Sequence, residues 1–119
     1  MSVEPKSPAS RASRPGGGFG LSVADLGGLS ATLLDDVATL EAALGRGLGG
    51  LAQGMSFRRH EFEPRGLSLI GTTARARVVV HTWPERGALT IDLYADTDEL
   101  RDVLSRCIDE MLAAQPSAG

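Results

Sequence analysis

The sequence predicts an α+β fold: a two-layer sandwich in which a mostly antiparallel sheet carries two helices on one face. Two observations favour this class. Short alternating or β-branched segments, separated by turn residues, recur along the chain. Two longer segments place apolar residues three and four positions apart, the spacing of an amphipathic helix. Strands from several parts of the chain with two such helices imply a sheet covered on one side.

We expect one domain over residues 19–113, with a tail on either side. Residues 1–18 are rich in Ser, Pro, Arg and Gly and hold almost no apolar side chains. Such a composition cannot offset the entropy lost on ordering, so this segment is predicted to be a disordered tail. Residues 114–119 are predicted to be a second tail. With 119 residues, 42% of them hydrophobic, the chain suits one modest core.

The first strand and the first helix are predicted near the start of the domain. Residues 19–26 alternate apolar and polar side chains and are bounded by two glycines. A helix then begins with Ser30 as N-cap, with Asp35 and Asp36 near its positive end. Its core face is formed by Leu33, Leu34, Val37, Leu40 and Leu44. Glycines at positions 45, 47, 49 and 50 predict that this helix weakens and ends raggedly.

Four further strands and a final helix follow. The strands are predicted at residues 55–62, 67–70, 77–83 and 88–95, with turns at 64–66 and 84–87. Thr97 is the predicted cap of the final helix, whose first turn holds Asp98 and Glu99. The buried stripe of that helix is formed by Leu100, Val103, Leu104, Cys107, Ile108 and Met111.

Composition excludes several classes of function. A net charge of -3 and a pI near 5.3 argue against a nucleic-acid binder. No apolar stretch approaches the length of a transmembrane helix, and a cytoplasmic location is the default expectation. The single cysteine, Cys107, suits a reducing compartment. No zinc-ligand spacing, Gly-rich phosphate loop or nucleophile elbow occurs, so no metal site is expected.

The most informative segment is Val-Val-Val-His-Thr-Trp-Pro-Glu over residues 78–85, followed by Ala-Leu-Thr-Ile-Asp-Leu over 88–93. It joins a β-branched run, the only Trp, and a His and a Glu four residues apart around a proline. This segment resembles the core motif of the small prokaryotic S-adenosylmethionine decarboxylases, pyruvoyl-dependent enzymes that supply aminopropyl groups for spermidine synthesis. The resemblance extends from Leu21 to the helix after Asp96.

The resemblance implies roles for four residues that are retained. Phe62 falls on the adenine-stacking Phe of the family, and His81 on its stacking and processing His. Ser68 falls on the serine that assists processing, and Glu85 on the carboxylate that binds ribose. Three of them also have a structural reading: Phe62 as core, His81 as a sheet histidine bonded to a carbonyl, and Glu85 as a solvent-facing turn residue.

Two positions depart from the family. The serine that becomes the pyruvoyl group falls on Ala76, flanked by Arg75 and Arg77 where the family has Glu and His. The catalytic Cys falls on Asp96, which as a residue before a helix is read first as a cap. Two roles are open for the arginines: binding an anion such as a carboxylate or phosphate, or protecting a strand edge from aggregation. Near a ligand, their charge would favour a neutral or anionic nucleoside over a sulfonium.

The alanine decides the expected chemistry. Pyruvoyl formation requires a side-chain oxygen that attacks the preceding carbonyl, and Ala76 has none. Without the keto group no electron sink forms for decarboxylation, so no cofactor is expected. In an unbroken strand Ala76 and His81, five residues apart, face opposite sides, so a pocket shared by both requires a bend or bulge.

The sequence therefore predicts an S-adenosylmethionine decarboxylase-like protein of polyamine metabolism that lacks self-processing and decarboxylation. We expect it to bind adenosine or an S-adenosylmethionine-like ligand, or to regulate a partner. The resemblance implies a homodimer, or a heterodimer with an active paralogue. An enzyme with altered chemistry in the same pocket, and a structural interaction module with a collapsed pocket, are the alternatives.

Overall fold

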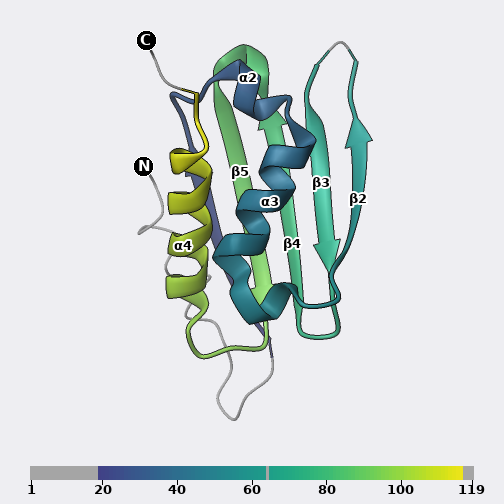
Figure 1. Cartoon of the computed structure of the whole chain (residues 1–119), viewed down its shortest axis with the longest axis vertical. Helices are drawn as coiled ribbons and strands as arrows, with labels where there is room; N and C mark the ends of the chain where they lie inside the picture. The colour runs from purple at the N-terminus through teal and green to yellow at the C-terminus, as the bar shows by residue number, and fades with distance from the viewer. Residues whose placement is uncertain (1–18, 64, 117–119) are drawn as a thin grey trace.

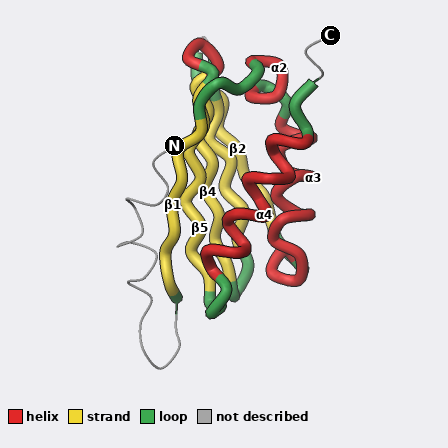
Figure 2. The backbone as a smooth tube through the Cα atoms, turned by 90° about the vertical axis from the view of Figure 1, so that its left-hand side faces the viewer, coloured by secondary structure: helices red, strands yellow, loops and turns green. Residues whose placement is uncertain are grey.

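The computed structural model of the protein describes residues 19–63 and 65–116. A five-stranded antiparallel sheet in the order β1-β5-β4-β3-β2 carries its helices on one side (Figures 1 and 2). The strands are β1 (Gly20–Leu26), β2 (Ser56–Glu61), β3 (Leu67–Thr72), β4 (Ala76–Trp83) and β5 (Ala88–Ala95). The helices are α2 (Ala31–Leu34), α3 (Val37–Leu48), η2 (Gly49–Ala52), η3 (Pro84–Arg86) and α4 (Leu100–Ala113). The predicted α+β sandwich is confirmed.

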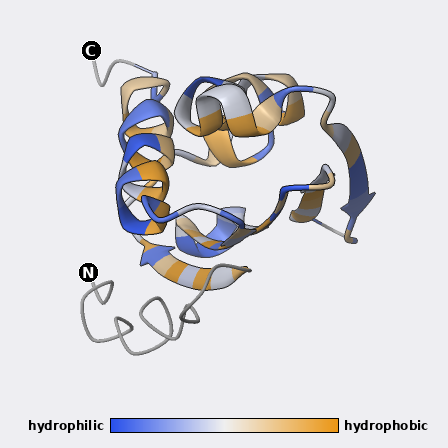
Figure 3. Cartoon of the chain, turned by 90° about the horizontal axis from the view of Figure 1, so that it is seen from below, coloured by the Kyte–Doolittle hydropathy of each residue, from blue (hydrophilic) through white to orange (hydrophobic). Residues whose placement is uncertain are grey.

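The strand alternation divides the sheet into a covered face and an open face. The covered face packs against α3 and α4, whose hydrophobic residues gather on the sides turned toward the sheet and each other (Figure 3). The open face is the opposite one, and none of the described helices covers it (Figure 2). In strand order it holds Leu21, Val23 and Asp25; Ala88, Thr90, Asp92 and Tyr94; Arg77, Val79, His81 and Trp83; Ser68, Ile70 and Thr72; and Ser56, Arg58 and His60.

The first predicted helix is broken in two by an aspartate. Ser30 caps α2 as predicted, accepting a hydrogen bond from the Thr32 N–H at 3.0 Å. Asp36 then caps α3, because its carboxylate accepts from the Thr39 N–H at 3.1 Å and from the Thr39 hydroxyl at 2.7 Å. An aspartate that bonds the backbone ahead of it begins a new helix rather than continuing an old one.

The weakening predicted at Gly45 and Gly47 is wrong, since α3 continues through both to Leu48; the helix does end before Gly49 and Gly50, which lie in η2. Gly47 faces α4, and a Cβ built on it would lie 2.5 Å from Cys107 Cα and 2.6 Å from Cys107 N. The glycine therefore lets the backbones of α3 and α4 approach closely. This packing outweighs the low helix propensity of glycine.

The final helix begins later than predicted. Thr97 and Asp98 lie in a turn ahead of α4; Thr97 Oγ1 accepts from the Glu99 N–H at 3.1 Å, so the threonine stabilises that turn and does not cap the helix. The buried stripe predicted for this helix is confirmed residue by residue. None of the described helices is long and apolar enough to cross a bilayer.

The chain segment after α4 returns to the start of α2. Gln115 Oε1 accepts a hydrogen bond from the Ser30 N–H at 2.6 Å. This contact involves part of the tail predicted at residues 114–119. The tail predicted at 1–18 and the end of the second, residues 117–119, lie outside the described residues.

Candidate functional site

A hydrogen-bonded serine and histidine lie on the open face. Ser68 on β3 and His81 on β4 are directly opposite in the register, and Ser68 Oγ is 2.6 Å from His81 Nδ1. Ser68 is only 7% exposed, and His81 is half-buried. Because Ser68 engages Nδ1, Nε2 is the ring nitrogen left for another partner.

Aromatic rings flank this pair toward one end of the sheet. The His81 and Trp83 ring centroids are 6.1 Å apart, and His60, opposite Ser68 on β2, contacts Phe62 edge-on at 4.6 Å. Phe62 is 46% exposed and Trp83 is 36% exposed. Phe62 is thus an accessible ring on the surface and not part of the core.

Glu85 lies at the same end of the sheet as Phe62. It is an exposed residue of η3, the short helical turn that directly follows Trp83. The β2–β3 hairpin adjoins this connection, because the Leu67 N–H donates to Thr82 Oγ1 at 3.1 Å. A Cβ on Gly66 would lie 3.0 Å from Thr82 O and 3.7 Å from Pro84 Cδ. The structure therefore gathers Phe62, Ser68, His81 and Glu85 at one end; we call this the His81 end.

Ala76 lies at the other end of the sheet and on its covered face. It is 1% exposed and stands opposite Ala95 in the register. The pairing of β4 with β5 is continuous from Ala76 to Trp83, so the bend or bulge needed for a shared pocket is absent. Along the strand, Ala76 and His81 are about 16 Å apart. A single pocket holding both residues is not formed within one chain.

Asp96 accompanies Ala76 at this second end, which we call the Ala76 end. The Asp96 N–H donates to Arg75 O at 2.9 Å, and Arg75 Nη2 donates to Asp96 O at 3.3 Å. The expected cap role of Asp96 is wrong, because α4 begins four residues later and no side chain caps it. The arginine at position 75 is engaged with the backbone, far from Glu85.

Thr73 was not among the predicted site residues, and its hydroxyl is near the Arg75–Ala76 peptide bond. Thr73 Oγ1 accepts hydrogen bonds from the Arg75 N–H at 3.0 Å and from the Ala76 N–H at 2.9 Å. A threonine two or three residues before a strand, following the turn pattern of such residues, is the signal that predicts this role. Its hydroxyl oxygen stabilises the β3–β4 turn.

Two carboxylates on the open face were also missed. Asp92 on β5 is half-buried, and burial raises the pKa of its carboxyl group. The positive charge of His81 lowers the pKa of Asp92, and the negative charge of Asp25 raises it. The alternation of Asp92 with Leu89, Ile91 and Leu93 is the signal that places it on the open face.

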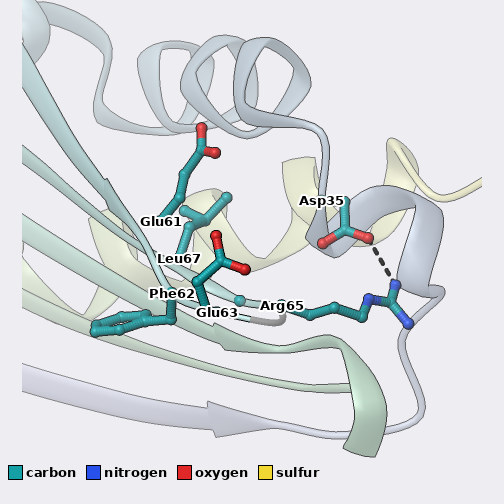
Figure 4. Close-up of a pocket in the computed structure, with 7 residues that line it drawn as sticks. Asp35, Glu61, Phe62, Glu63, Arg65 and Leu67 are labelled. Atoms are coloured by element: carbon teal, nitrogen blue, oxygen red, sulfur yellow. Dashed lines mark hydrogen bonds and ion pairs between the residues drawn. The ribbon is translucent and has the colours of Figure 1, made fainter.

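A cavity of about 310 Å³ lies beside the hairpin at the His81 end. Its lining comprises Asp35, Glu61, Phe62, Glu63, Arg65, Gly66 and Leu67. Figure 4 shows Arg65 reaching Asp35, at 2.6 Å, while the ring of Phe62 points away from this ion pair. The ion pair connects the hairpin to the helical layer. Among the described residues, no cluster of His, Cys, Asp or Glu suits a metal ion.

Comparisons with known proteins agree on one family. The sequence model described as S-adenosylmethionine decarboxylase matches residues 21–118. An S-adenosylmethionine decarboxylase proenzyme from Caldanaerobacter subterraneus is 28% identical over 81 residues, covering 66% of this chain and 64% of the relative. One from Picrophilus torridus is 32% identical over 78 residues, covering 64% of this chain and 59% of the relative. The chain thus spans less than two thirds of the length of these relatives.

A solved structure gives the same fold. The crystal structure of the adenosylmethionine decarboxylase from Aquifex aeolicus matches with a TM-score of 0.60 and 24% sequence identity. The match covers 85% of this chain and 82% of that one. At this identity the likeness establishes the sandwich architecture.

Proposed function

Because this chain belongs to the S-adenosylmethionine decarboxylase family, we propose that it is a nucleoside-binding protein of polyamine metabolism that performs no pyruvoyl-dependent decarboxylation. One observation carries the proposal. The Ser68–His81 hydrogen bond is present at 2.6 Å among exposed aromatic rings, whereas Ala76 stands where the family resemblance places the pyruvoyl-forming serine.

The residues around Ala76 do not fit a pyruvoyl group. Its formation needs a side-chain oxygen on residue 76, and a methyl group supplies none. That methyl group is buried against the helical layer beside Ala95. The nearby hydroxyl of Thr73 accepts from the Ala76 N–H and cannot replace an oxygen on residue 76 itself.

The His81 end suits a nucleoside. The exposed ring of Phe62 offers an apolar face for a base, with offset or edge-on geometry favoured. The carboxylate of Glu85 accepts two hydrogen bonds, which matches the vicinal hydroxyls of a ribose. His81 keeps Nε2 for a further contact because Ser68 engages Nδ1. Within one copy Asp96 lies at the opposite end from His81, so altered catalysis that uses both residues would require a second copy.

We further propose that the partner is a second copy, packed open face to open face. The open face and the residue before β1 expose large apolar side chains at both ends: Phe19, Leu21 and Tyr94 at the Ala76 end, and Trp83 with the adjoining Phe62 at the His81 end. Phe19 stacks on Tyr94 with ring centroids 5.1 Å apart. A two-fold axis across the strands would place the Ala76 end of one copy over the His81 end of the other.

Intact-mass spectrometry and calorimetry together test the proposal. The purified chain is expected at its full mass, with no pyruvoyl group, and to release binding heat with adenosine and S-adenosylmethionine. Glu85→Ala is expected to weaken both affinities by about tenfold, since two hydrogen bonds to a charged group are lost. Asp109→Ala, on the exposed side of α4, is the control and leaves both affinities unchanged.

Two results would overturn the proposal. Two fragments split before Ala76 would show that self-processing occurs. Absence of binding heat for both ligands would assign the chain to the structural interaction modules. A monomer that becomes a dimer only with an active paralogue would replace the homodimer by the heterodimer.

A further inference from the structure

We propose that the Asp35–Arg65 ion pair positions Phe62 for ligand binding, by holding the β2–β3 hairpin against the helical layer. This inference rests on the proposed nucleoside site and adds to it two positioning residues that do not touch the ligand. It also makes the affinity for an uncharged nucleoside depend on ionic strength.

The hairpin carries Phe62 in a place that apolar packing fixes only weakly. The hairpin residues that line the cavity of about 310 Å³ ahead of Gly66 are all exposed: Glu61, Phe62, Glu63 and Arg65. Asp35, which also lines this cavity, belongs to the connection between α2 and α3. A segment with few buried side chains is displaced at low cost, so a single cross-layer contact has a large share in holding it.

A short path of hydrogen bonds connects the ion pair to Phe62. Arg65 Nη2 donates to Asp35 Oδ2 at 2.6 Å (Figure 4). The Phe62 N–H donates to Gly66 O at 2.8 Å, and this bond joins the two ends of the turn that carries Arg65. A displacement of Arg65 from the helical layer therefore moves Phe62 with it.

The helical end of the ion pair is itself held in place. Asp35 is the C-cap of α2, and its N–H donates to Ala31 O at 3.0 Å. The next residue, Asp36, caps α3 by accepting from the Thr39 N–H at 3.1 Å. The carboxylate of Asp35 is thus anchored between two helices, and the hairpin is the element whose position depends on the ion pair.

The charges around the cavity make the arginine more important than its partner. Asp35 faces a hairpin that also carries Glu61 and Glu63, and Arg59 lies 3.5 Å from Glu61. Without the positive charge of Arg65, carboxylates on the hairpin and on the helical layer repel one another. Without the negative charge of Asp35, only an attraction is lost. We therefore expect Arg65→Gln to displace the hairpin more than Asp35→Asn does.

The ion pair is open to solvent, so salt changes its strength. The Arg65 and Asp35 side chains are 44% and 46% exposed. Because Asp35 belongs to the helical layer, a second copy packed on the open face leaves this pair uncovered. An exposed pair contributes modestly and is screened by ions. Adenosine carries no charge, so an effect of salt on its affinity reports on the protein.

The test is calorimetry of adenosine with wild type, Asp35→Asn, Arg65→Gln and the double variant at about 0.03 and 0.5 M salt. At low salt we expect Arg65→Gln to weaken the affinity by roughly two- to fivefold, and Asp35→Asn by less. The double variant should bind no worse than Arg65→Gln, since it also removes the repulsion. High salt should weaken the wild type and leave the double variant unchanged. Arg65→Lys keeps the charge and should retain most of the affinity.

Two further variants show whether the ion pair acts through the ring. In a Phe62→Ala background, Arg65→Gln should cause no additional loss, because no ring remains to be positioned. The matched control is Arg46→Gln, which breaks the Arg46–Glu110 pair, also 2.6 Å long and exposed, between α3 and α4. It should leave both the affinity and its salt dependence unchanged. Circular dichroism checks that each variant is folded.

Equal adenosine affinities of the wild type, Asp35→Asn and Arg65→Gln would overturn the positioning role and leave the proposed function standing. The same holds for a salt dependence that persists in the double variant, or for an additional loss in the Phe62→Ala background. Failure of the wild type to bind either adenosine or S-adenosylmethionine would overturn the proposed function itself.

Discussion

Ala76 and His81 belong to the same uninterrupted strand and face opposite sides of the sheet, the first against the helices and the second on the open face. The residues of the Ala76 end and those of the His81 end therefore share a strand but lie apart in space. The alanine at one end therefore leaves the hydrogen-bonded pair at the other end undisturbed.

Restoring a serine at the first position is not expected to restore self-processing. In Ala76→Ser the new hydroxyl enters a buried site on the covered face, remote from His81 of its own copy and facing away from a second copy on the open face, so the chain keeps its full mass. A buried hydroxyl without a good partner costs about 1–3 kcal/mol of unfolding free energy. Intact-mass spectrometry and urea unfolding measure the two effects. The triple variant Arg75→Glu, Ala76→Ser, Arg77→His is the stricter comparison, and cleavage in either variant would contradict this prediction.

Gly47 and Gly45 form a matched pair on α3. In Gly47→Ala the new methyl group meets the Cys107 backbone, where a Cβ would lie 2.5 Å from Cα, so we expect a loss of about 1–3 kcal/mol. A Cβ on Gly45 meets nothing within 4 Å. Gly45→Ala is therefore expected to stabilise the protein by about 0.5–1 kcal/mol. Thermal and urea unfolding of both variants measure the difference, and equal effects would refute the close-approach argument.

A charge in the centre of the open face is expected to break the proposed dimer. Val79→Arg places a guanidinium between the two facing sheets, where burial without a partner is strongly unfavourable. Sedimentation velocity should show a monomer with unchanged circular dichroism. Leu112→Arg, at an exposed position of α4, provides the comparison and should remain dimeric. A dimer that survives Val79→Arg would assign the contact to another surface.

The ionisation of Asp92 is expected to reduce stability near neutral pH. Burial raises the pKa of Asp92 above its ordinary value of 3.8, so the folded state favours the protonated carboxyl more than the unfolded state does. The stability that this carboxyl group contributes is fully present at pH values below its ordinary pKa, and it is lost as the pH rises through the raised pKa of the folded state. Asp92→Asn, which stays neutral, should exceed wild type in unfolding free energy at pH 7, and this advantage should vanish near pH 3. An advantage independent of pH would point to packing instead.

Much of the fold followed from local pattern. The strand predicted at residues 88–95 is β5 residue for residue, because its strict alternation has one face to bury. The stripe on α4 followed from the helical spacing of apolar residues three and four positions apart. The break before α3 and its continuation past Gly45 could not be predicted from local pattern. The break depends on the hydrogen bond that Asp36 accepts from the Thr39 N–H, and the continuation depends on the close packing of α4 against Gly47.

The site was predictable only in part, for a geometric reason. Family resemblance named Ser68 and His81, and the structure joins them by a hydrogen bond. A family resemblance assigns roles to positions along the chain, however, and does not say which face of the sheet each side chain is on. Strand alternation alone was enough to separate Ala76 from His81. The proximity of Asp92 to His81 became evident only from the strand register.

The close approach of Gly47 to Cys107 has a practical consequence for following motion in solution. Cys107 is the single cysteine of the chain; its side chain is fully covered, and burial raises the pKa of the thiol to about 12. Alkylating reagents react with the thiolate, so modification must await separation of α3 from α4. The rate of labelling by iodoacetamide would thus report how often the two helices part, without any engineered probe.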